Sequence, residues 1–151
     1  MNNYKNNLKL IPFCQEGLDE AYKIYKKELY DVIEKVFGWD DKFQSDRFQK
    51  SYKLEWFHWI ENQDERIGYV CFFQTENENE IHISLLIITR ELQGNGHGKD
   101  VMFIIEQNAK QQNLKVALSS FKENKRAVSF YQNLGYKIAS QDEHFIDLVL
   151  E

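Results

Sequence analysis

Three strand-like runs separated by short polar segments constrain the fold of this chain more than any other feature. They are residues 54–61 (LEWFHWIE), 66–73 (RIGYVCFF) and 80–88 (EIHISLLII). All three are rich in aromatic and β-branched residues, which is typical of β-strands. The segments between them, NQDE and TENEN, are short and polar enough to be turns. We therefore expect the three strands to pair as an antiparallel meander.

Helical spacing occurs on both sides of this meander. Apolar residues recur every three or four positions from residue 18 to 36, which predicts an amphipathic helix ending near Gly38. Asp40 or Asp41 is placed to cap a second helix. The same spacing predicts helices over residues 101–109 and 127–134, the second closed by Gly135. Further short strands are expected over residues 8–13 and 115–120, and at two places within 136–150.

The predicted order of elements is thus β-α-α-β-β-β-α-β-α-β-β. It indicates a mixed α/β (α+β) fold, with a mostly antiparallel central sheet of six to seven strands flanked by about four helices. A length of 151 residues favours one domain spanning residues 1–151. Pro12 is the only proline, so no Pro-rich linker divides the chain.

Composition narrows the range of partners. The net charge is −5 and no basic run exceeds two residues, so we expect no nucleic-acid partner. The longest aliphatic run, residues 85–88, is too short to span a membrane, and the first 13 residues lack the apolar core of a signal peptide. Cys14 and Cys71 stand in no metal or redox spacing, and the four histidines are far apart in sequence. We expect reduced thiols, no metal and a cytoplasmic location.

Residues 91–107 (ELQGNGHGKDVMFIIEQ) place three glycines at the mouth of a predicted helix. The first amides of a helix lack intrahelical partners, and glycine has no Cβ atom to keep a phosphate away from them. A packing turn explains the glycines equally well when they are taken alone. Two familiar phosphate motifs do not fit. Lys99 is followed by Asp100 rather than Ser or Thr, and no acid lies at the spacing of a dinucleotide fingerprint.

Two motifs in this half of the chain match one family. Residues 93–98 (QGNGHG) fit the pattern (Arg/Gln)-x-x-Gly-x-Gly, and residues 124–136 (NKRAVSFYQNLGY) fit Asn-x-x-Ala-x-x-apolar-Tyr-x-x-x-Gly-(Phe/Tyr). On these motifs the sequence resembles the GNAT superfamily of acyl-CoA-dependent N-acyltransferases. The resemblance covers residues 80–137 in detail and the first half in element order. It implies a GNAT-like fold and transfer of an acetyl group from acetyl-CoA to a primary amine, by direct attack in a ternary complex. A non-catalytic CoA-binding or sensor domain is the alternative.

The resemblance also implies which residues bind the cofactor. The pyrophosphate of coenzyme A is expected on the backbone amides of the glycine loop. The pantetheine arm is expected to pair with the main chain of the preceding strand. Asn124 is expected at the cofactor arm, a role compatible with capping a helix. The implied set is Leu86, Ile87, Ile88, Gln93, Gly94, Asn95, Gly96, His97, Gly98, Lys99, Asn124 and Tyr131.

For the chemistry, Tyr131 falls on the family's thiolate-protonating tyrosine, so the resemblance makes it the general acid. The general base stays open. His82 lies near the position where some members have a glutamate, and Glu80 shares its strand face. Water-relayed deprotonation is the third choice. Neither cysteine is expected to form a covalent intermediate.

The acceptor is expected beside the loop between the first two helices, where Trp39, Asp40 and Phe43 stand. An acid among aromatic rings suits a cationic amine, although a helix cap with a packed ring explains the same residues. The sequence does not distinguish a small amine from a protein amine. Dimers are common in such folds, so a homodimer is a further expectation.

Overall fold

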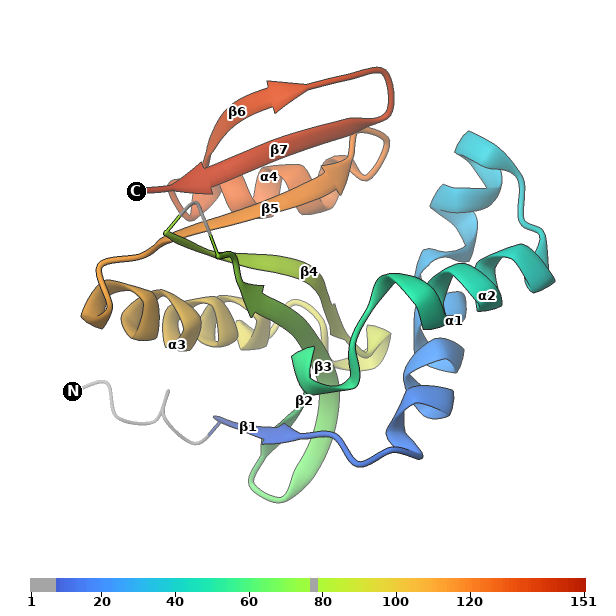
Figure 1. Ribbon diagram of the computed structural model, residues 1–151, viewed down its shortest axis with the longest axis horizontal. Helices are drawn as coiled ribbons and strands as arrows, with labels where there is room; N and C mark the ends of the chain where they lie inside the picture. Colours follow the sequence, from blue (N-terminus) through green and yellow to red (C-terminus); the bar gives the residue numbers. More distant parts are fainter. Residues whose placement is uncertain (1–7, 77–78) are drawn as a thin grey trace. The chain divides into compact units, whose positions relative to one another are not determined.

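The computed structural model describes residues 8–76 and 79–151, and its elements follow the predicted order (Figure 1). The strands are β1 (Leu8–Pro12), β2 (Phe57–Asn62), β3 (Glu65–Gln74), β4 (Glu80–Ile88), β5 (Lys115–Phe121), β6 (Lys137–Gln141) and β7 (Phe145–Leu150). The α-helices are α1 (Gly17–Phe37), α2 (Asp41–Ser51), α3 (His97–Gln111) and α4 (Lys125–Asn133), with short 3-10 turns η2 (Leu54–Trp56) and η3 (Arg90–Leu92). None of the helices within residues 8–76 and 79–151 combines the length and the hydropathy of a membrane span.

The strands form one seven-stranded sheet in the order β1-β2-β3-β4-β5-β7-β6. The pairs β1–β2, β2–β3, β5–β7 and β6–β7 are antiparallel, whereas β4 and β5 are parallel. A parallel pair needs a crossover connection, and α3 supplies it. The mixed α/β class and the mostly antiparallel sheet are therefore confirmed.

One expectation from the sequence is wrong in detail, and another lies partly outside the described residues. The first predicted strand of the meander begins too early, because residues 54–56 form η2, in which Trp56 N–H donates to Lys53 O at 3.0 Å. The turn TENEN lies partly outside the described residues, which omit Asn77 and Glu78. Its ends meet where Thr75 N–H donates to Glu80 O at 2.9 Å.

The chain divides into two compact units. The first, here the N-terminal unit, contains the chain up to Cys71 together with Leu85–Val101, and the second, the C-terminal unit, contains Phe72–Ser84 and Met102–Glu151. Strands β3 and β4 and helix α3 each pass from one unit into the other. That all 151 residues act as one domain stays a prediction.

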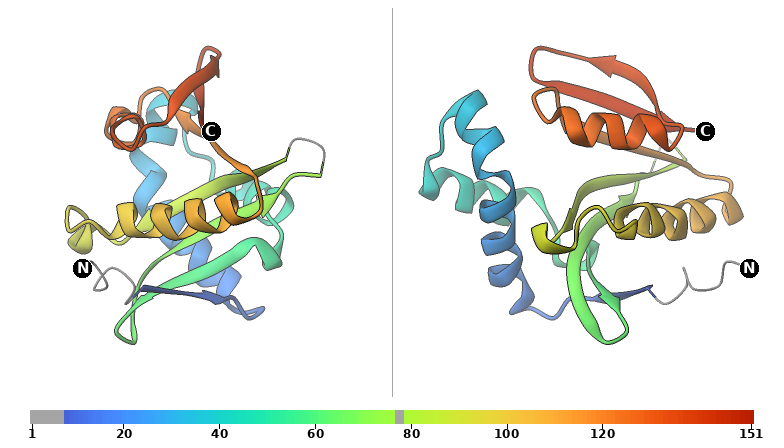
Figure 2. Two further views of the ribbon diagram at one scale, coloured as in Figure 1. Left: turned by 90° about the vertical axis from the view of Figure 1, so that its left-hand side faces the viewer. Right: turned by 180° about the vertical axis from the view of Figure 1, so that it is seen from behind.

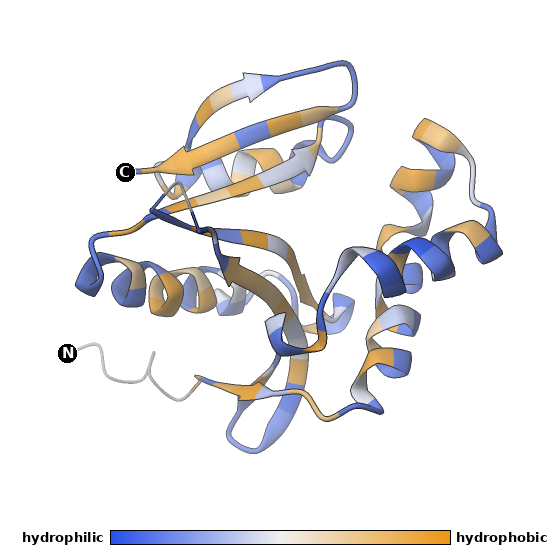
Figure 3. Ribbon diagram, viewed as in Figure 1, coloured by the Kyte–Doolittle hydropathy of each residue, from blue (hydrophilic) through white to orange (hydrophobic). Residues whose placement is uncertain are grey.

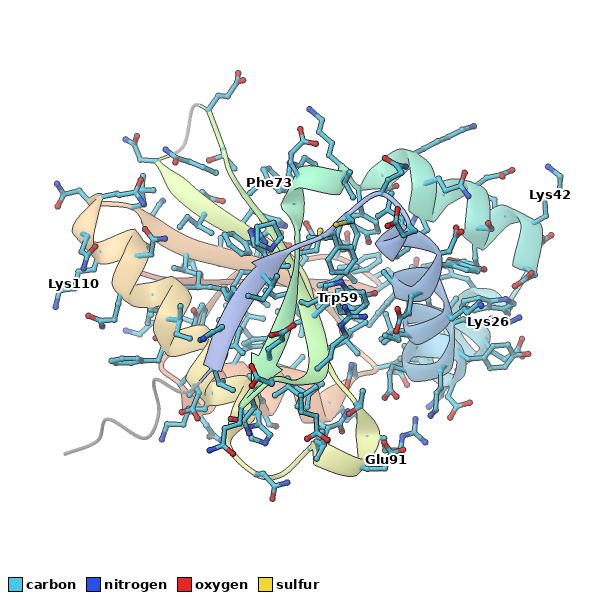
Figure 4. All side chains as sticks on the ribbon, turned by 90° about the horizontal axis from the view of Figure 1, so that it is seen from below. Lys26, Lys42, Trp59, Phe73, Glu91 and Lys110 are labelled. Carbon is cyan, nitrogen blue, oxygen red and sulfur yellow. The ribbon has the colours of Figure 1, made fainter. Side chains whose placement is uncertain are left out.

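The core of the N-terminal unit is aromatic. Phe13 stacks on Trp59 with ring centroids 4.1 Å apart, and both rings contact Tyr69. Tyr69 is fully buried and its hydroxyl donates to Ala21 O at 3.0 Å, which joins β3 to α1. Figure 4 labels Trp59 within this cluster, and Figure 3 shows hydrophobic colouring along much of β3. Because such rings bury large apolar areas, this core fixes where α1 lies on its strands.

The core of the C-terminal unit is mainly aliphatic and lies on one face of β5 and β7. Alternate residues point to it, since Val116, Leu118, Ile146 and Leu148 are all buried. Helix α4 packs along β5 (Figure 2). On the other face, Asp147 accepts hydrogen bonds from Ser119 and Ser140, at 2.5 and 2.7 Å, so a polar bridge spans three strands.

The two halves of β4 have different neighbours. Only Glu80–Ile83 pair with β5, opposite Lys115–Leu118. At its other end β4 stays close to β3, because Thr89 N–H donates to Ile67 O at 2.9 Å. The backbones approach so closely at Gly68 that a Cβ atom there would overlap the carbonyl oxygen of Ile87. Glycine at this position is what permits the approach.

We expect Gly68→Ala to lower the free energy of unfolding by about 3 kcal/mol, the upper end of the range for overpacking. The added methyl group meets backbone atoms, including Ile88 Cα at 2.9 Å, which have little room to move. Urea denaturation followed by circular dichroism measures the change. Gly38→Ala is the matched control: its Cβ meets nothing within 4 Å, and only its left-handed φ of +79° adds strain, about 1–2 kcal/mol. Equal destabilisation of the two variants would contradict the close approach.

Candidate functional site

The connection from β4 to α3 has a backbone that only glycine adopts easily. After η3 the chain runs through Gln93, Gly94, Asn95 and Gly96 before α3 begins at His97. Gly94 and Gly96 have φ of +85° and +84°, and a Cβ atom at either would meet nothing within 4 Å. Their left-handed conformation, not crowding, therefore requires glycine. The open space also leaves the backbone accessible to a ligand.

Side chains of this loop are used to hold its shape. Gln93 Nε2 donates to Ile88 O at 2.7 Å, which ties the loop to the end of β4. Asn95 Nδ2 donates to Leu92 O at 3.3 Å. The amide of Gln93 itself donates to Arg90 O at 3.3 Å, so this amide is already engaged. Ligand binding by the loop thus falls chiefly to the main chain after Gln93.

The amides at the start of α3 are oriented for an anion. Asp100 N–H donates to Gly96 O at 3.1 Å as the first helical hydrogen bond. Helix geometry consequently leaves the amides of His97, Gly98 and Lys99 without intrahelical acceptors. The positive end of the helix dipole lies at the same place. Bare amides at a helix N-terminus, preceded by an exposed glycine turn, suit a phosphate group.

The end of β4 next to this loop presents one strand edge to a ligand. Leu86 is half-buried, and Ile87 and Ile88 are buried at 6% and 8% exposure. Over the described residues, the β5 pairing stops at Ile83, so the main chain beyond it has no strand partner on that side. An extended ligand could add to this edge by main-chain hydrogen bonds.

In the C-terminal unit, Asn124 is the N-cap of α4. Its side-chain oxygen accepts from Ala127 N–H at 3.3 Å, and this confirms the capping role. Its side-chain NH2 donates to no residue that the structure describes. The amide end of Asn124 is therefore compatible with a second, ligand-binding role.

Tyr131 lies in α4 with its ring enclosed and its hydroxyl uncommitted. The residue is 9% exposed, and its ring contacts Phe130 and Tyr136 at centroid distances of 5.0 and 5.8 Å. Within the described chain its hydroxyl makes no hydrogen bond. Burial raises the pKa of Tyr131 well above 10, which keeps the phenol protonated at neutral pH. The Tyr131 hydroxyl is therefore a hydrogen-bond donor that is available to a ligand.

Tyr136 and Glu106 form an anchor beside Tyr131 that the sequence analysis missed. Tyr136 O–H donates to Glu106 Oε2 at 2.8 Å, and Tyr136 N–H donates to Tyr131 O at 3.1 Å. Burial raises the pKa of Glu106, and the hydrogen bond from Tyr136 partly offsets that rise. The only signal in the sequence was Tyr rather than Phe at the last position of the second motif. Since the Tyr131 hydroxyl has no bond of its own, packing against the anchored ring positions it.

The two candidate bases lie on one strand, as expected. Glu80 is the first residue of β4 and is buried at 8% exposure. His82 is half-buried and its ring lies 5.5 Å from that of Phe73. Both belong to the part of β4 that pairs with β5. The structure brings them to one face without selecting between them.

The expected acceptor residues are largely occupied with local contacts. Asp40 is the N-cap of α2, where its side chain accepts from Phe43 N–H at 3.1 Å. The Phe43 ring is exposed at 60%, and Trp39 packs on Tyr30 at 5.2 Å. Asp40 is therefore committed to the helix start rather than left to bind a cation.

The neighbouring acid, Asp41, has three donors of its own. It accepts from Lys26, Trp39 Nε1 and the Tyr22 hydroxyl at 2.9, 3.2 and 3.1 Å. The hydrogen bond from Lys26 is the main reason that the pKa of Asp41 is lowered. The Tyr22 pKa is raised to about 12, first by burial and then by Asp41. These contacts link α2 to α1, and Lys26 compensates the charge of Asp41.

The described residues contain no candidate metal site. Within residues 8–76 and 79–151, no three His, Cys, Asp or Glu side chains are placed to share an ion. Cys14 is exposed and Cys71 is buried, and both are free thiols. Burial raises the pKa of Cys71 to about 12, so it is a poor nucleophile.

Comparison with known proteins identifies the family. Residues 18–136 match the family model described as the acetyltransferase (GNAT) family, which covers most of the chain. This protein therefore belongs to the GNAT acetyltransferase family. A search of the curated proteins finds no match.

Solved structures of other acetyltransferases share the fold. A putative acetyltransferase, YycN, from Bacillus subtilis has a TM-score of 0.75 at 17% identity, covering 90% of this chain and 96% of its own. The PaiA N-acetyltransferase from Thermoplasma acidophilum, solved in complex with coenzyme A, has a TM-score of 0.73 at 15% identity, covering 95% and 98%. An N-acetyltransferase from Staphylococcus aureus Mu50 has a TM-score of 0.71 at 13% identity, covering 94% and 100%. At these identities the likeness shows the fold alone.

We expect Tyr136→Phe to lower the free energy of unfolding by about 1–2 kcal/mol, because the half-buried Glu106 carboxylate loses its hydrogen-bond donor. Urea denaturation at pH 7 measures the change. Tyr30→Phe removes a phenol hydroxyl from a residue that is 39% exposed, and its effect should stay within about 0.5 kcal/mol. An equally small change in unfolding free energy for Tyr136→Phe and Tyr30→Phe would contradict a stabilising role of the hydrogen bond between Tyr136 and Glu106.

A pH dependence follows from the raised pKa of Glu106. A carboxyl whose pKa is raised in the folded state stabilises the fold below its unfolded value of 4.5. That stability is lost as the pH rises through the folded pKa. Glu106→Gln keeps an acceptor for the Tyr136 hydroxyl and cannot ionise. Its unfolding free energy relative to the parent should therefore increase from about pH 4 to about pH 7.

Urea denaturation at several pH values measures this difference. Glu65→Gln, which removes the same charge at an exposed position, is the control. A difference for Glu106→Gln that is constant or decreases with pH would contradict the burial of this carboxyl.

Proposed function

We propose that this protein is an acetyl-CoA-dependent N-acetyltransferase that transfers an acetyl group to a primary amine. The observation that supports it most is the glycine loop, residues 93–99, which joins a strand with one unpaired edge to the unbonded amides of α3. Membership of the GNAT acetyltransferase family supports the reaction class. Coenzyme A in the PaiA structure supports the donor.

In this proposal the main chain binds most of the donor. The amides of Gly94 to Lys99 bind the pyrophosphate, and the main chain of Leu86, Ile87 and Ile88 pairs with the pantetheine arm. The side-chain amide of Asn124 contacts the same arm while its oxygen continues to cap α4. The residues fit this group because the loop exposes amides and a Cβ atom at Gly94 or Gly96 would meet only open space.

The reaction needs two protons removed from the ammonium nitrogen and one supplied to the leaving thiolate. After the first is lost, the neutral amine attacks the thioester carbonyl, forming a C–N bond and a tetrahedral oxyanion, for which a backbone N–H of β4 is the donor. The nitrogen then gives its second proton to water, the C–S bond breaks as the C=O bond re-forms, and the departing thiolate takes a proton from Tyr131, which regains one from water. The raised pKa of Tyr131 makes it a reliable hydrogen-bond donor at neutral pH, although a weaker acid than a solvated phenol.

The amine loses its proton to His82, to Glu80 or to water relayed past them. Imidazole suits this work near neutral pH. We further propose that the enzyme is cytoplasmic, has a single domain and needs no metal. A homodimer is a further expectation.

The function is tested by incubating the protein with acetyl-CoA and a panel of primary amines, and by following free thiol release. Amine-dependent thiol release, with an acetylated product in the mass spectrum, is expected. Tight CoA binding without thiol release for any amine would favour a non-catalytic CoA-binding domain instead. Absence of CoA binding by calorimetry would exclude both.

We expect Tyr131→Phe to lower kcat by about 100-fold or more, the contribution typical of a general acid, with the dissociation constant for CoA changed less than about twofold. Thiol release and calorimetry measure the two quantities. Tyr52→Phe removes the hydroxyl of a half-buried tyrosine that has no proposed role in the reaction, and it should retain turnover. Unchanged turnover in Tyr131→Phe would remove Tyr131 from the mechanism.

A further inference from the structure

A turn at the end of α4 brings Tyr136 back onto Tyr131. Residues Leu134–Tyr136 join α4 to β6 (Figure 1). The carbonyl oxygen of Tyr131 accepts from the backbone N–H groups of Leu134 and Tyr136, both at 3.1 Å. Gly135 lies between them with a φ of +101°, a left-handed conformation that closes the helix and that glycine adopts without strain. The main chain therefore holds the two tyrosines next to each other.

The rings of the two tyrosines meet edge to face inside the C-terminal unit. Their centroids are 5.8 Å apart, with an interplanar angle of 67°. The Phe130 ring makes a similar contact with Tyr131, at 5.0 Å and 68°. Both tyrosines are buried. Since edge-to-face contacts are directional, the direction of the Tyr131 ring depends on where the Tyr136 ring is fixed.

Within the described chain, a hydrogen bond holds one of the two phenol hydroxyls and not the other. Tyr136 O–H donates to Glu106 Oε2 at 2.8 Å, and Glu106 belongs to α3. A bond between a phenol and a carboxylate is short and directional. Tyr131 O–H has no acceptor among the described residues. The proposed general acid is thus the phenol that is free to act, and its neighbour is the phenol that is anchored.

Apolar packing alone does not account for this anchor. A phenylalanine at position 136 would bury the same ring without a polar group that needs a partner. The anchor also places a carboxyl group at a half-buried position, where burial raises the pKa of Glu106. The hydroxyl and the carboxylate therefore fix the orientation of the Tyr136 ring rather than add buried area.

Orientation matters because of the step proposed for Tyr131. A general acid acts only when its proton lies within hydrogen-bond reach of the leaving atom. A displacement of about 1 Å in such a geometry can lower a rate by about 100-fold. The rings packed against Tyr131 are what directs its hydroxyl, since no hydrogen bond to a described residue does so.

We propose that Tyr136 and Glu106 are positioning residues for the proton transfer from Tyr131 to the leaving thiolate. Their hydrogen bond fixes the Tyr136 ring, and this ring directs the Tyr131 hydroxyl. This deepens the proposed function and rests on it. Neither positioning residue contacts the donor or the acceptor, and neither exchanges a proton during the reaction.

The test measures kcat for thiol release from acetyl-CoA with an amine that the parent protein accepts. Tyr136→Phe keeps the ring and removes its anchor, so kcat should fall about 10-fold, less than for loss of the general acid itself. The KM for acetyl-CoA should stay within about twofold, because the contacts of the donor are unchanged. A Tyr136→Phe variant with the kcat of the parent would overturn the proposal.

Two variants of Glu106 separate the hydrogen bond from the charge. Glu106→Leu removes the acceptor and should lower kcat as Tyr136→Phe does. Glu106→Gln keeps an oxygen that accepts from Tyr136 O–H, so its kcat should stay within about twofold of the parent. Equal losses of kcat in both variants would show that the charge matters rather than the bond, and would overturn the positioning role.

A double-mutant cycle tests whether Tyr136 acts through Tyr131. Without the Tyr131 hydroxyl there is nothing left to direct, so adding Tyr136→Phe to Tyr131→Phe should lower kcat by less than about twofold. Losses that multiply in the double variant would show two independent effects and would overturn the proposal.

Ser119→Ala is the control for a merely structural effect. It removes another hydroxyl that donates to a carboxylate of the same unit, Asp147, at 2.5 Å. Its kcat should stay within about twofold of the parent. A loss equal to that of Tyr136→Phe would show that any weakening of the C-terminal unit slows turnover, and would overturn the positioning role.

The failure of this proposal differs from the failure of the proposed function. Turnover that falls in Tyr131→Phe and not in Tyr136→Phe would overturn the positioning role and leave the acetyltransferase intact. No thiol release by the parent protein with any amine of the panel would overturn the proposed function, and the positioning role with it.

Discussion

The pairing of β4 changes along its length, and the positions of the unpaired strand edge and of the loop after it follow from this change. Its first four residues pair with β5, whereas its end stays against β3, where Gly68 admits the carbonyl of Ile87. A strand paired on one side only leaves a row of main-chain groups for a ligand. The glycine loop begins where this edge ends, and Gln93 ties the loop back to Ile88. One strand therefore sets the position of both parts of the proposed donor site, the unpaired edge and the glycine loop.

The two kinds of proposed site residue are held by different forces. In the loop the positive φ of Gly94 and Gly96 shapes the main chain whose amides are proposed to bind the donor, so side-chain identity should matter little there. Tyr131 is the opposite case, because its hydroxyl is the proposed general acid and only packing positions its ring. The Tyr136 hydroxyl on Glu106 anchors one of the rings in that packing. In this proposal, backbone conformation provides binding and an anchored aromatic pair provides chemistry.

Much of this could be predicted from the sequence, because local patterns determine it. The element order follows from hydrophobic periodicity, and the glycine loop and the cap at Asn124 follow from motifs that encode backbone geometry. Contacts between distant segments could not be predicted. Nothing local to Gly68 indicates that Ile87 lies against it, and nothing local to Glu106 indicates Tyr136. Asp40, by contrast, was ambiguous, and the structure shows it as a helix cap.

The glycine loop is proposed to bind the pyrophosphate of coenzyme A through main-chain amides. The most direct measurement is a titration of the 15N-labelled protein with CoA, following backbone amide shifts by NMR. We expect the largest shifts at Gly94 to Lys99, with further shifts at Leu86 to Ile88, and much smaller loop shifts with pantetheine, which lacks the pyrophosphate. Saturable CoA binding that leaves the amides of residues 94–99 unshifted would contradict it.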